Sequence, residues 1–268
     1  PVLWAAQHMG IPTLIQEQNS YAGVTNKILS RRADRICVAY EGMERFFPAD
    51  KIVMTGNPIR SIIVPATPEM KEAGIKEYGL DPSRKHIFIV GGSLGSARFN
   101  QCMKEWISDG CPGLDGVDVL WQCGKHYRPD IDRFMDEQRT KNPDVARHIH
   151  HSDFIGRMEL AYAAADVVIS RSGASSVSEL CAARKAVIFI PSPNVAEDHQ
   201  THNAMALVKK DAAVVVKDAE AMEKMIPTAL ELLKDPARIA TLEENAGKMA
   251  LPDAAGKIAE EVYKLIKG

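Results

Sequence analysis

Two short loops of glycine and serine carry the clearest chemical signal in this sequence. The first glycine loop is residues 91–96 (Gly-Gly-Ser-Leu-Gly-Ser), directly after the apolar run 87–90. The second glycine loop is residues 171–176 (Arg-Ser-Gly-Ala-Ser-Ser), directly after the apolar run 167–170. A strand, a turn of small residues and a helix N-terminus present free backbone N–H groups and a helix dipole to an anion, which favours phosphate. In one parallel sheet both loops would meet the same edge, so the pattern predicts a diphosphate that spans both.

Ser93 has three interpretations. Residues 91–95 match G-x-S-x-G, the nucleophile elbow of α/β-hydrolases, and they have the strand–turn–helix setting of that motif. A hydrolase would need an acid and a histidine later in the chain, and Asp166 with His199 or His202 would serve on order alone. We rank a phosphate-cradle serine first, a turn residue second and a nucleophile third, since the elbow leaves the second glycine loop unexplained.

Glu179 also has two interpretations. Ser176 and Glu179 fit the spacing of a capping box, in which the carboxylate satisfies its own helix N-terminus, and spacing alone favours this role. The functional alternative places Glu179 one turn inside a helix that points at a ligand. A carboxylate there suits a ribose diol, because it accepts from both hydroxyls.

A third polar segment, residues 197–203, follows the apolar run 187–190. Asp198, His199 and His202 could ligate a metal, but no third His or Cys lies at ligand spacing. We therefore favour a polar loop that lines the crevice at the same sheet edge as the two glycine loops. We expect no metal and no cofactor.

Strand-like and helix-like segments alternate along the chain, which indicates an α/β fold with a parallel sheet. Three strands are expected first, at 13–17, 35–39 and 51–55, with helices at 2–9, 25–33 and near 42–46. Six more follow the turn-rich stretch 56–68, at 86–90, 117–122, 148–150, 166–170, 186–190 and 212–216. Six strands with crossovers predict a complete doubly wound domain, whereas three predict an incomplete one. The segment 254–266 is an amphipathic helix that packs either on its own domain or back on the first.

Composition and charge exclude several classes of protein. The 268 residues carry a formal net charge of −2, which gives no electrostatic footprint for nucleic acid. Five scattered cysteines predict reduced thiols in a cytosolic protein rather than a disulfide framework. No apolar run approaches the length of a membrane span. The chain opens at Pro1 and passes directly into a helical pattern, which predicts a fragment of a longer protein.

The motifs in this order and spacing resemble the MurG family of bacterial glycosyltransferases over nearly the whole chain. This family adds N-acetylglucosamine to the lipid-linked muramyl-pentapeptide precursor of peptidoglycan. Besides the two glycine loops, the resemblance rests on the segments 17–19, 22–27, 56–60, 153–155, 178–179, 198–204 and 251–254.

The resemblance implies a GT-B-type fold of two Rossmann-like doubly wound domains, the N-terminal one incomplete. Residues 1–61 would belong to the acceptor domain and residues 62–268 to the domain that binds the UDP-sugar donor. The function implied is inverting transfer from UDP-N-acetylglucosamine. The alternatives are a UDP-sugar-binding module, a UDP-sugar epimerase or, less favoured, the serine hydrolase.

The resemblance also implies roles for individual residues. Ile155 would contact uracil through its backbone, Glu179 the ribose, and Gln200 the sugar hydroxyls, with Asn203 a weaker candidate. The remaining implied donor contacts are Asn19, Arg60, Ser93, Ala174, Ser175, Ser176, Val177 and Ser178.

The family has two further glycine-rich loops ahead of the first residue here. The general base is therefore expected in that preceding segment, and the fragment alone is expected to be inactive. The implied partners are UDP-N-acetylglucosamine, a lipid-linked acceptor and other cell-wall or division proteins. The implied location is peripheral, on the cytoplasmic face of the bacterial inner membrane.

Overall fold

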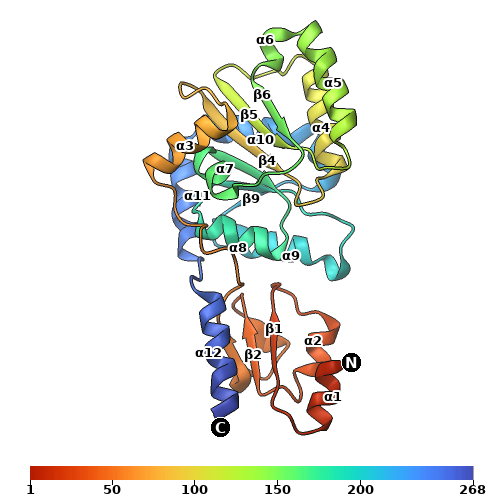
Figure 1. Cartoon of the computed structure of the whole chain (residues 1–268), viewed down its shortest axis with the longest axis vertical. Coiled ribbons are helices and arrows are strands. Elements are labelled where there is room, and N and C mark those ends of the chain that lie inside the picture. The colour runs from red at the N-terminus through yellow and green to blue at the C-terminus, as the bar shows by residue number, and fades with distance from the viewer. Residues whose placement is uncertain (268) are drawn as a thin grey trace.

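The computed structural model describes residues 1–267 and contains two parallel sheets, one above the other in Figure 1. The lower sheet has the order β1-β2-β3, with β1 at Leu14–Glu17, β2 at Arg35–Val38 and β3 at Ile52–Met54. Its helices are α1 (Val2–His8) and α2 (Val24–Leu29), with short 3-10 turns at Met43–Arg45 and Ala49–Lys51. The helix expected at 25–33 ends early, at Leu29, and the Ser30 hydroxyl beyond it donates to the Lys27 carbonyl at 2.9 Å.

The upper sheet has six parallel strands in the order β6-β5-β4-β7-β8-β9. Counted from β4 this is the order 3-2-1-4-5-6 of a dinucleotide-binding fold, and its switch point lies between β4 and β7. The strands are β4 (Lys85–Val90), β5 (Val117–Gln122), β6 (Ile149–Ser152), β7 (Val167–Ser170), β8 (Val187–Phe189) and β9 (Val214–Val215). All six expected strands are present, and the expected α/β class is confirmed.

Helices cover both faces of the upper sheet, which is why its strands are apolar on both sides. Phe88 and Val90 face one core and Ile87 and Ile89 the other, and all four are buried. One face carries α3 (Pro68–Tyr78), α7 (Met158–Ala164), α8 (Ala174–Ala182) and α9 (His199–Val208). The other carries α4 (Ala97–Ser108), α5 (Arg128–Lys141) and α10 (Ala221–Leu233), while α6 is Pro143–Ala146 and α11 is Pro236–Lys248.

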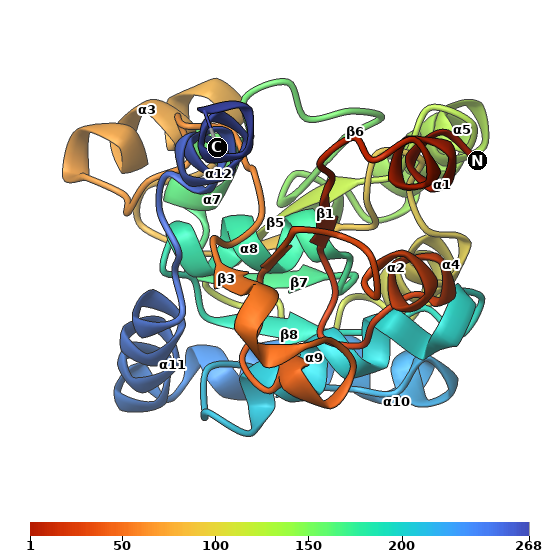
Figure 2. The same cartoon turned by 90° about the horizontal axis from the view of Figure 1, so that it is seen from below.

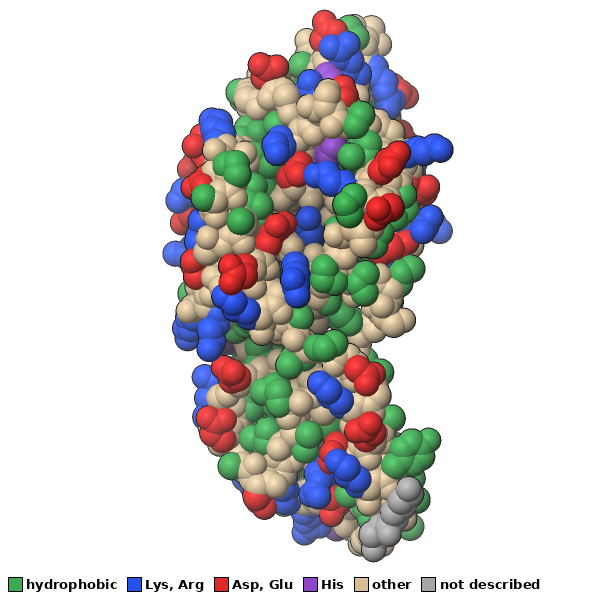
Figure 3. Space-filling view, turned by 90° about the vertical axis from the view of Figure 1, so that its left-hand side faces the viewer, with side chains coloured by type: hydrophobic (Ala, Val, Ile, Leu, Met, Phe, Trp, Pro, Cys, Tyr) green, Lys and Arg blue, Asp and Glu red, His purple; other side chains and the backbone are tan. Residues whose placement is uncertain are grey.

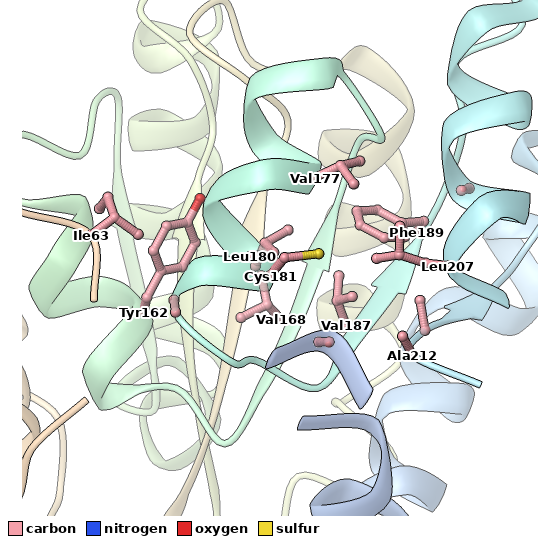
Figure 4. Packing of buried hydrophobic residues seen from close by; sticks show 14 of the residues in the cluster. Ile63, Tyr162, Val168, Val177, Leu180, Cys181, Val187, Phe189, Leu207 and Ala212 are labelled. Atoms are coloured by element: carbon pink, nitrogen blue, oxygen red, sulfur yellow. The ribbon is translucent and has the colours of Figure 1, made fainter. Parts of the chain in front are cut away.

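The first of these cores continues from the upper sheet into the lower one. Val177, Leu180 and Cys181 of α8 pack against Phe189 of β8 and Leu207 of α9 (Figure 4). The same cluster includes buried residues of the lower sheet. Helices α8 and α9 therefore lie between the two sheets, as Figures 1 and 2 show from two directions.

The last helix, α12 (Ala254–Lys267), lies beside the lower sheet in Figure 1. Glu261 is buried there and forms an ion pair of 3.4 Å with Arg35 of β2. Gly56 allows the chain leading to α12 to pass close by: its φ is +88°, and a Cβ would meet Leu251 Cβ at 2.6 Å. Helix α12 thus contacts the lower sheet through the ion pair of Glu261 with Arg35.

All five cysteines are buried and none is in a disulfide. Within residues 1–267, no helix is both long and apolar enough to span a membrane.

Candidate functional site

The two glycine loops lie side by side at one edge of the upper sheet. Strands β4 and β7 are paired, with Val90 opposite Ser170, so the chain leaves both strands at the same edge. The glycines of both loops line one groove of about 550 Å³, and Ser176, Ser192 and Gln200 also line it. The structure therefore brings together the two loops that the sequence singled out.

The first glycine loop needs its glycines for close packing. A Cβ on Gly91 would lie 2.5 Å from the backbone nitrogen of Ser96. A Cβ on Gly95 would lie 2.3 Å from the Cys123 carbonyl oxygen, and the φ of Gly95 is +78°. Real Cβ atoms do not approach so closely, so this loop forms only with glycine at these two positions.

Arg171 joins the two loops, a role that the sequence analysis missed. Its guanidinium donates to Ser96 Oγ at 2.9 Å and to Asp218 Oδ1 at 2.6 Å, and it lies 4.6 Å from the Phe99 ring centroid. The available signal was an arginine placed directly after a buried strand, because a charge at such a position needs partners.

The N-terminus of α8 has no side-chain cap. Gly173 is the N-cap residue, so Ser176 lies within the first turn of α8 and Glu179 in the second. The capping-box interpretation of Ser176 and Glu179 is therefore wrong, because the helix begins three residues earlier than that motif requires. The uncapped N–H groups of the first turn remain for a ligand or water.

Glu179 instead links the two halves of the molecule. Its carboxylate accepts from Arg60 Nε at 3.0 Å and Nη2 at 2.9 Å, in the bidentate geometry of strong pairs. The Tyr162 hydroxyl donates to the same carboxylate at 3.3 Å. Burial and the neighbouring Glu179 raise the pKa of Tyr162, and the hydrogen bond to Glu179 raises the pKa of Arg60. Two predicted donor contacts thus lie against each other.

Asn203 forms a second link between the halves and is fully buried. Its side-chain nitrogen donates to Asn19 Oδ1 at 3.0 Å and to the Ser172 carbonyl at 3.2 Å, while its oxygen accepts from the Ser20 backbone at 2.9 Å. These bonds engage both ends of the amide, so Asn203 connects the second glycine loop to Asn19.

Glu17 holds Asn19 from the other side. Its buried carboxylate accepts from the Asn19 backbone at 3.0 Å, from the Gly23 backbone at 3.0 Å and from Asn26 Nδ2 at 2.9 Å. The sequence analysis used Glu17 only as part of the segment 17–19 that carries the family resemblance, and assigned it no such role.

Two further predicted contacts lie at the same sheet edge. Ile155 follows β6, and its side chain is buried in the core. Gln200 lies in the first turn of α9, after β8, and its Oε1 accepts from the Ser192 backbone at 2.9 Å. The carboxyl ends of β6, β4, β7 and β8 thus carry, in this order, Ile155, Ser93, the second glycine loop and Gln200.

The hydrolase alternative fails on geometry. Ser93 follows β4, whereas Asp166 precedes β7, so the two residues lie at opposite edges of a parallel sheet. Asp166 is bound to Lys71 at 2.8 Å and to the His86 backbone at 2.8 Å. Ser93 also lacks the positive φ of a strained elbow, which occurs at Gly92 and Gly95 instead.

His199 and His202 lie beside Tyr21, which stacks on His202 at a centroid distance of 4.8 Å. Among residues 1–267 no group of three or more His, Cys, Asp or Glu side chains is arranged to hold a metal ion.

The sheet order, the paired loops and the groove define the class of this protein: a GT-B-type glycosyltransferase. Residues 86–258 match the glycosyltransferase family 28 C-terminal domain. The solved structure of Acinetobacter baumannii MurG is similar with a TM-score of 0.73 at 28% identity, covering 98% of this chain and 69% of that one. S. aureus MnaA with UDP shares the fold alone, at a TM-score of 0.65 and 14% identity over 99% of this chain and 72% of that one.

Two curated relatives carry the name UDP-N-acetylglucosamine–N-acetylmuramyl-(pentapeptide) pyrophosphoryl-undecaprenol N-acetylglucosamine transferase. The one from Parabacteroides distasonis is 49% identical over 99% of this chain and 70% of its own length. The one from Bacteroides fragilis is 51% identical over 99% of this chain and 68% of its own length. The chain therefore belongs to the MurG family of N-acetylglucosaminyltransferases.

Proposed function

We propose that this chain binds UDP-N-acetylglucosamine in the groove between the two glycine loops. The reaction it serves is inverting transfer of N-acetylglucosamine to the lipid-linked muramyl-pentapeptide of peptidoglycan synthesis. The observation that carries this proposal is the pairing of the two loops in one groove beside the uncapped N-terminus of α8. Such a site offers fixed N–H groups to a diphosphate.

The donor extends along the sheet edge in the order of the strands. Uracil lies at the backbone of Ile155 after β6, and the diphosphate lies over Ser93 and the second glycine loop. The sugar is held by α8 residues 174–178 and by Gln200, with Asn19 facing it from the lower sheet. Asn203 acts through Asn19, because its own amide is engaged at both ends.

Glu179 accepts hydrogen bonds from the ribose diol while it remains paired with Arg60. A carboxylate offers about four lone-pair sites; the Arg60 guanidinium uses two of them and the Tyr162 hydroxyl a third, so one ribose hydroxyl takes the free site and the other replaces Tyr162. The same pair joins donor binding to the contact between the two halves of the molecule.

In the transfer step the acceptor hydroxyl oxygen forms a bond to the anomeric carbon, and the bond from that carbon to the β-phosphate oxygen breaks. The hydroxyl proton leaves to a base, and the electron pair of the broken bond leaves with UDP. Negative charge that grows on the diphosphate is met by the N–H groups of the glycine loops and the N-terminus of α8, an electrostatic role that requires no metal.

The acceptor named for the relatives is linked to undecaprenol, so we place this chain at the cytoplasmic face of the bacterial inner membrane as a peripheral protein. It would meet other cell-wall or division proteins there.

Product analysis tests the function. A chain of the relatives' full length carrying this sequence is incubated with UDP-N-acetylglucosamine and lipid-linked acceptor, and the products are separated by mass spectrometry. The proposal expects free UDP and a disaccharide lipid in equal amounts. An epimerised UDP-sugar, or binding of the donor with no product, would contradict it.

A further inference from the structure

A second and larger cavity lies between the two sheets, and we name it the hinge groove. It has a volume of about 820 Å³, within the usual range of about 300–1,000 Å³ for small-molecule sites. Its walls come from the ends of β2 and β3, from α8 and α9, and from the end of α11. The lining residues that carry the argument are Ser20, Tyr40, Ala206, Lys209, Lys248 and Met249.

The hinge groove shares no lining residue with the groove of the glycine loops, although Val177 and Ser178, which belong to the proposed sugar site, form part of its α8 wall. Helix α8 divides them: Gly173 and Ser176 line the glycine-loop groove, while Cys181 and Ala182 line the hinge groove. Figure 3 shows hydrophobic side chains gathered where the molecule narrows between its two parts.

Two residues that line the hinge groove have buried hydroxyl groups without a partner among the described residues. Tyr40 is 8% exposed and Ser20 is 6% exposed, and neither Tyr40 OH nor Ser20 Oγ makes a hydrogen bond within residues 1–267. Burial raises the pKa of Tyr40, so its hydroxyl stays neutral and can donate. A buried polar group without a partner destabilises the folded protein, and an acceptor on a ligand would relieve that cost.

The rim of the hinge groove is positively charged and its walls are apolar. Arg45, Lys209, Lys210 and Lys248 line it against one carboxylate, Glu41. Lys210 pairs with Glu41 at 3.3 Å and Lys248 with Glu244 at 2.8 Å, whereas Lys209 has no ion pair among the described residues. Alanine, methionine, valine and leucine side chains form most of the remaining wall.

We propose that the hinge groove is a binding site for a small amphiphilic anion, a molecule with an apolar body and a phosphate or carboxylate head. The apolar body packs between α8 and α9, the head lies at Lys209 and Lys248, and a polar atom of the ligand accepts from Tyr40. Because the walls come from both parts of the molecule, the occupant stabilises the whole chain against unfolding.

Calorimetry and thermal melts with four probes test this site. Octyl phosphate and octanoate, both below their micellar concentrations, represent the two head groups. Inorganic phosphate lacks the apolar chain, and octanol lacks the charged head. At least one of the amphiphiles should bind about tenfold more tightly than either half alone and raise the melting temperature. Binding by neither amphiphile, or equal binding of octanol, would overturn the proposal.

Variants locate the site. Ala206→Trp fills the groove and should lower the affinity for the amphiphile at least about tenfold. Ala240→Trp, on the exposed face of α11, should leave that affinity unchanged. Should Ala206→Trp fail to fold, the surface variant Lys209→Gln/Lys248→Gln replaces it and should weaken binding at least about threefold. UDP affinity should be unchanged in both; a parallel loss of UDP affinity, or unchanged probe affinity, would contradict a separate site.

Tyr40→Phe gives a further readout that packing alone would not produce. It removes the partnerless hydroxyl, so the free protein should melt at the same or a higher temperature while probe affinity falls about threefold or more. Tyr263→Phe, at an exposed tyrosine of α12, is the matched control. Unchanged probe affinity in Tyr40→Phe would exclude the hydroxyl from the site and overturn the placement of the ligand.

Discussion

Glu179 takes part both in the proposed binding of the donor and in the contact between the two halves of the molecule. Its carboxylate is bidentate with Arg60, which is 119 residues away in the sequence, and it also accepts from Tyr162. Sequence spacing favoured a local helix cap, but the helix begins at Ala174 and leaves Glu179 free to reach across the molecule. Substitution of this residue should therefore affect both ligand affinity and the contact with Arg60.

We predict that Glu179→Gln weakens UDP binding by roughly 1.5–3 kcal/mol, the range for a hydrogen bond to a charged group, which is about ten- to hundredfold in affinity. The measurement is calorimetric UDP affinity, with thermal melts to follow the loss of the Arg60 pair. Glu159→Gln is a matched control, because Glu159 is another buried carboxylate paired with an arginine, Arg157 at 2.9 Å. UDP affinity in Glu179→Gln equal to that of the parent would remove the ribose role.

Ser93 provides the second residue-scale test. Its side chain is exposed at the tip of the first glycine loop, where backbone N–H groups remain when the hydroxyl is removed. Ser93→Ala should therefore lower UDP affinity by less than about tenfold, since a neutral hydrogen bond contributes about 1 kcal/mol. A larger loss, with an unchanged melting temperature, would show that the hydroxyl rather than the loop backbone holds the phosphate.

At the scale of elements, the first glycine loop is specified by its backbone. We predict that Gly95→Ala lowers the free energy of unfolding more than Gly92→Ala does. Both glycines have positive φ, so both variants incur about 1–2 kcal/mol of strain. Only Gly95 also faces a carbonyl, that of Cys123, whereas a Cβ on Gly92 meets nothing within 4 Å. Urea titrations of the two variants measure the difference, and equal losses would contradict the close contact.

The β5–β6 pair carries a buried charge network around Asp118, whose side chain is 1% exposed. Burial alone would raise the pKa of Asp118, but the His150 ring, whose Nε2 lies 3.6 Å from the carboxylate, and hydrogen bonds from the Asp81 backbone and His148 outweigh it and lower the pKa to about 2. A carboxyl whose pKa is lower in the folded state than in the unfolded state stabilises the folded protein at pH values above the unfolded pKa. That contribution to the free energy of unfolding is lost as pH falls from about 4 toward 2.

We therefore predict that the parent loses about 2 kcal/mol more than Asp118→Asn does when the free energy of unfolding is followed from pH 5 down to pH 2. Asp118→Asn should also be the less stable protein at pH 7, because it leaves His148 and Arg84 without their anion. Asp115→Asn, at an exposed aspartate, should follow the parent. Parallel curves of unfolding free energy against pH for the parent and Asp118→Asn would show that Asp118 does not contribute this pH dependence.

Periodicity predicted the elements well because the upper sheet is covered on both faces, which makes its strands continuous apolar runs. All six of its strands lie where the sequence placed them, although β9 is shorter than expected. Helix boundaries were less accurate: α8 has a glycine N-cap, and its neighbouring serines offered a false start. Local spacing cannot separate these cases, since the correct start depends on how the strand ends.

At the scale of the whole molecule, the contacts that the sequence could not predict are those between distant segments. Asn203 is 184 residues from Asn19, and the ion pair of Arg35 with Glu261 joins the first sheet to the last helix. No periodic pattern encodes such pairs. The sequence singled out the two glycine loops, Ser176 and Gln200, which line one groove, but it did not predict that Glu179 pairs with Arg60 or that Asn203 bonds Asn19.

The central claim, that the diphosphate of the donor lies between the two glycine loops, is tested most directly at Gly173. A Cβ on Gly173 meets nothing within 4 Å and its φ is −64°, so Asp and Asn both fit there as helix N-caps. The measurement is calorimetric affinity of Gly173→Asp and Gly173→Asn for UDP and for uridine, which lacks the diphosphate. We predict that Gly173→Asp binds UDP at least about tenfold more weakly than Gly173→Asn, through repulsion between like charges, while both variants bind uridine alike. Equal UDP affinity in the two variants would contradict the account.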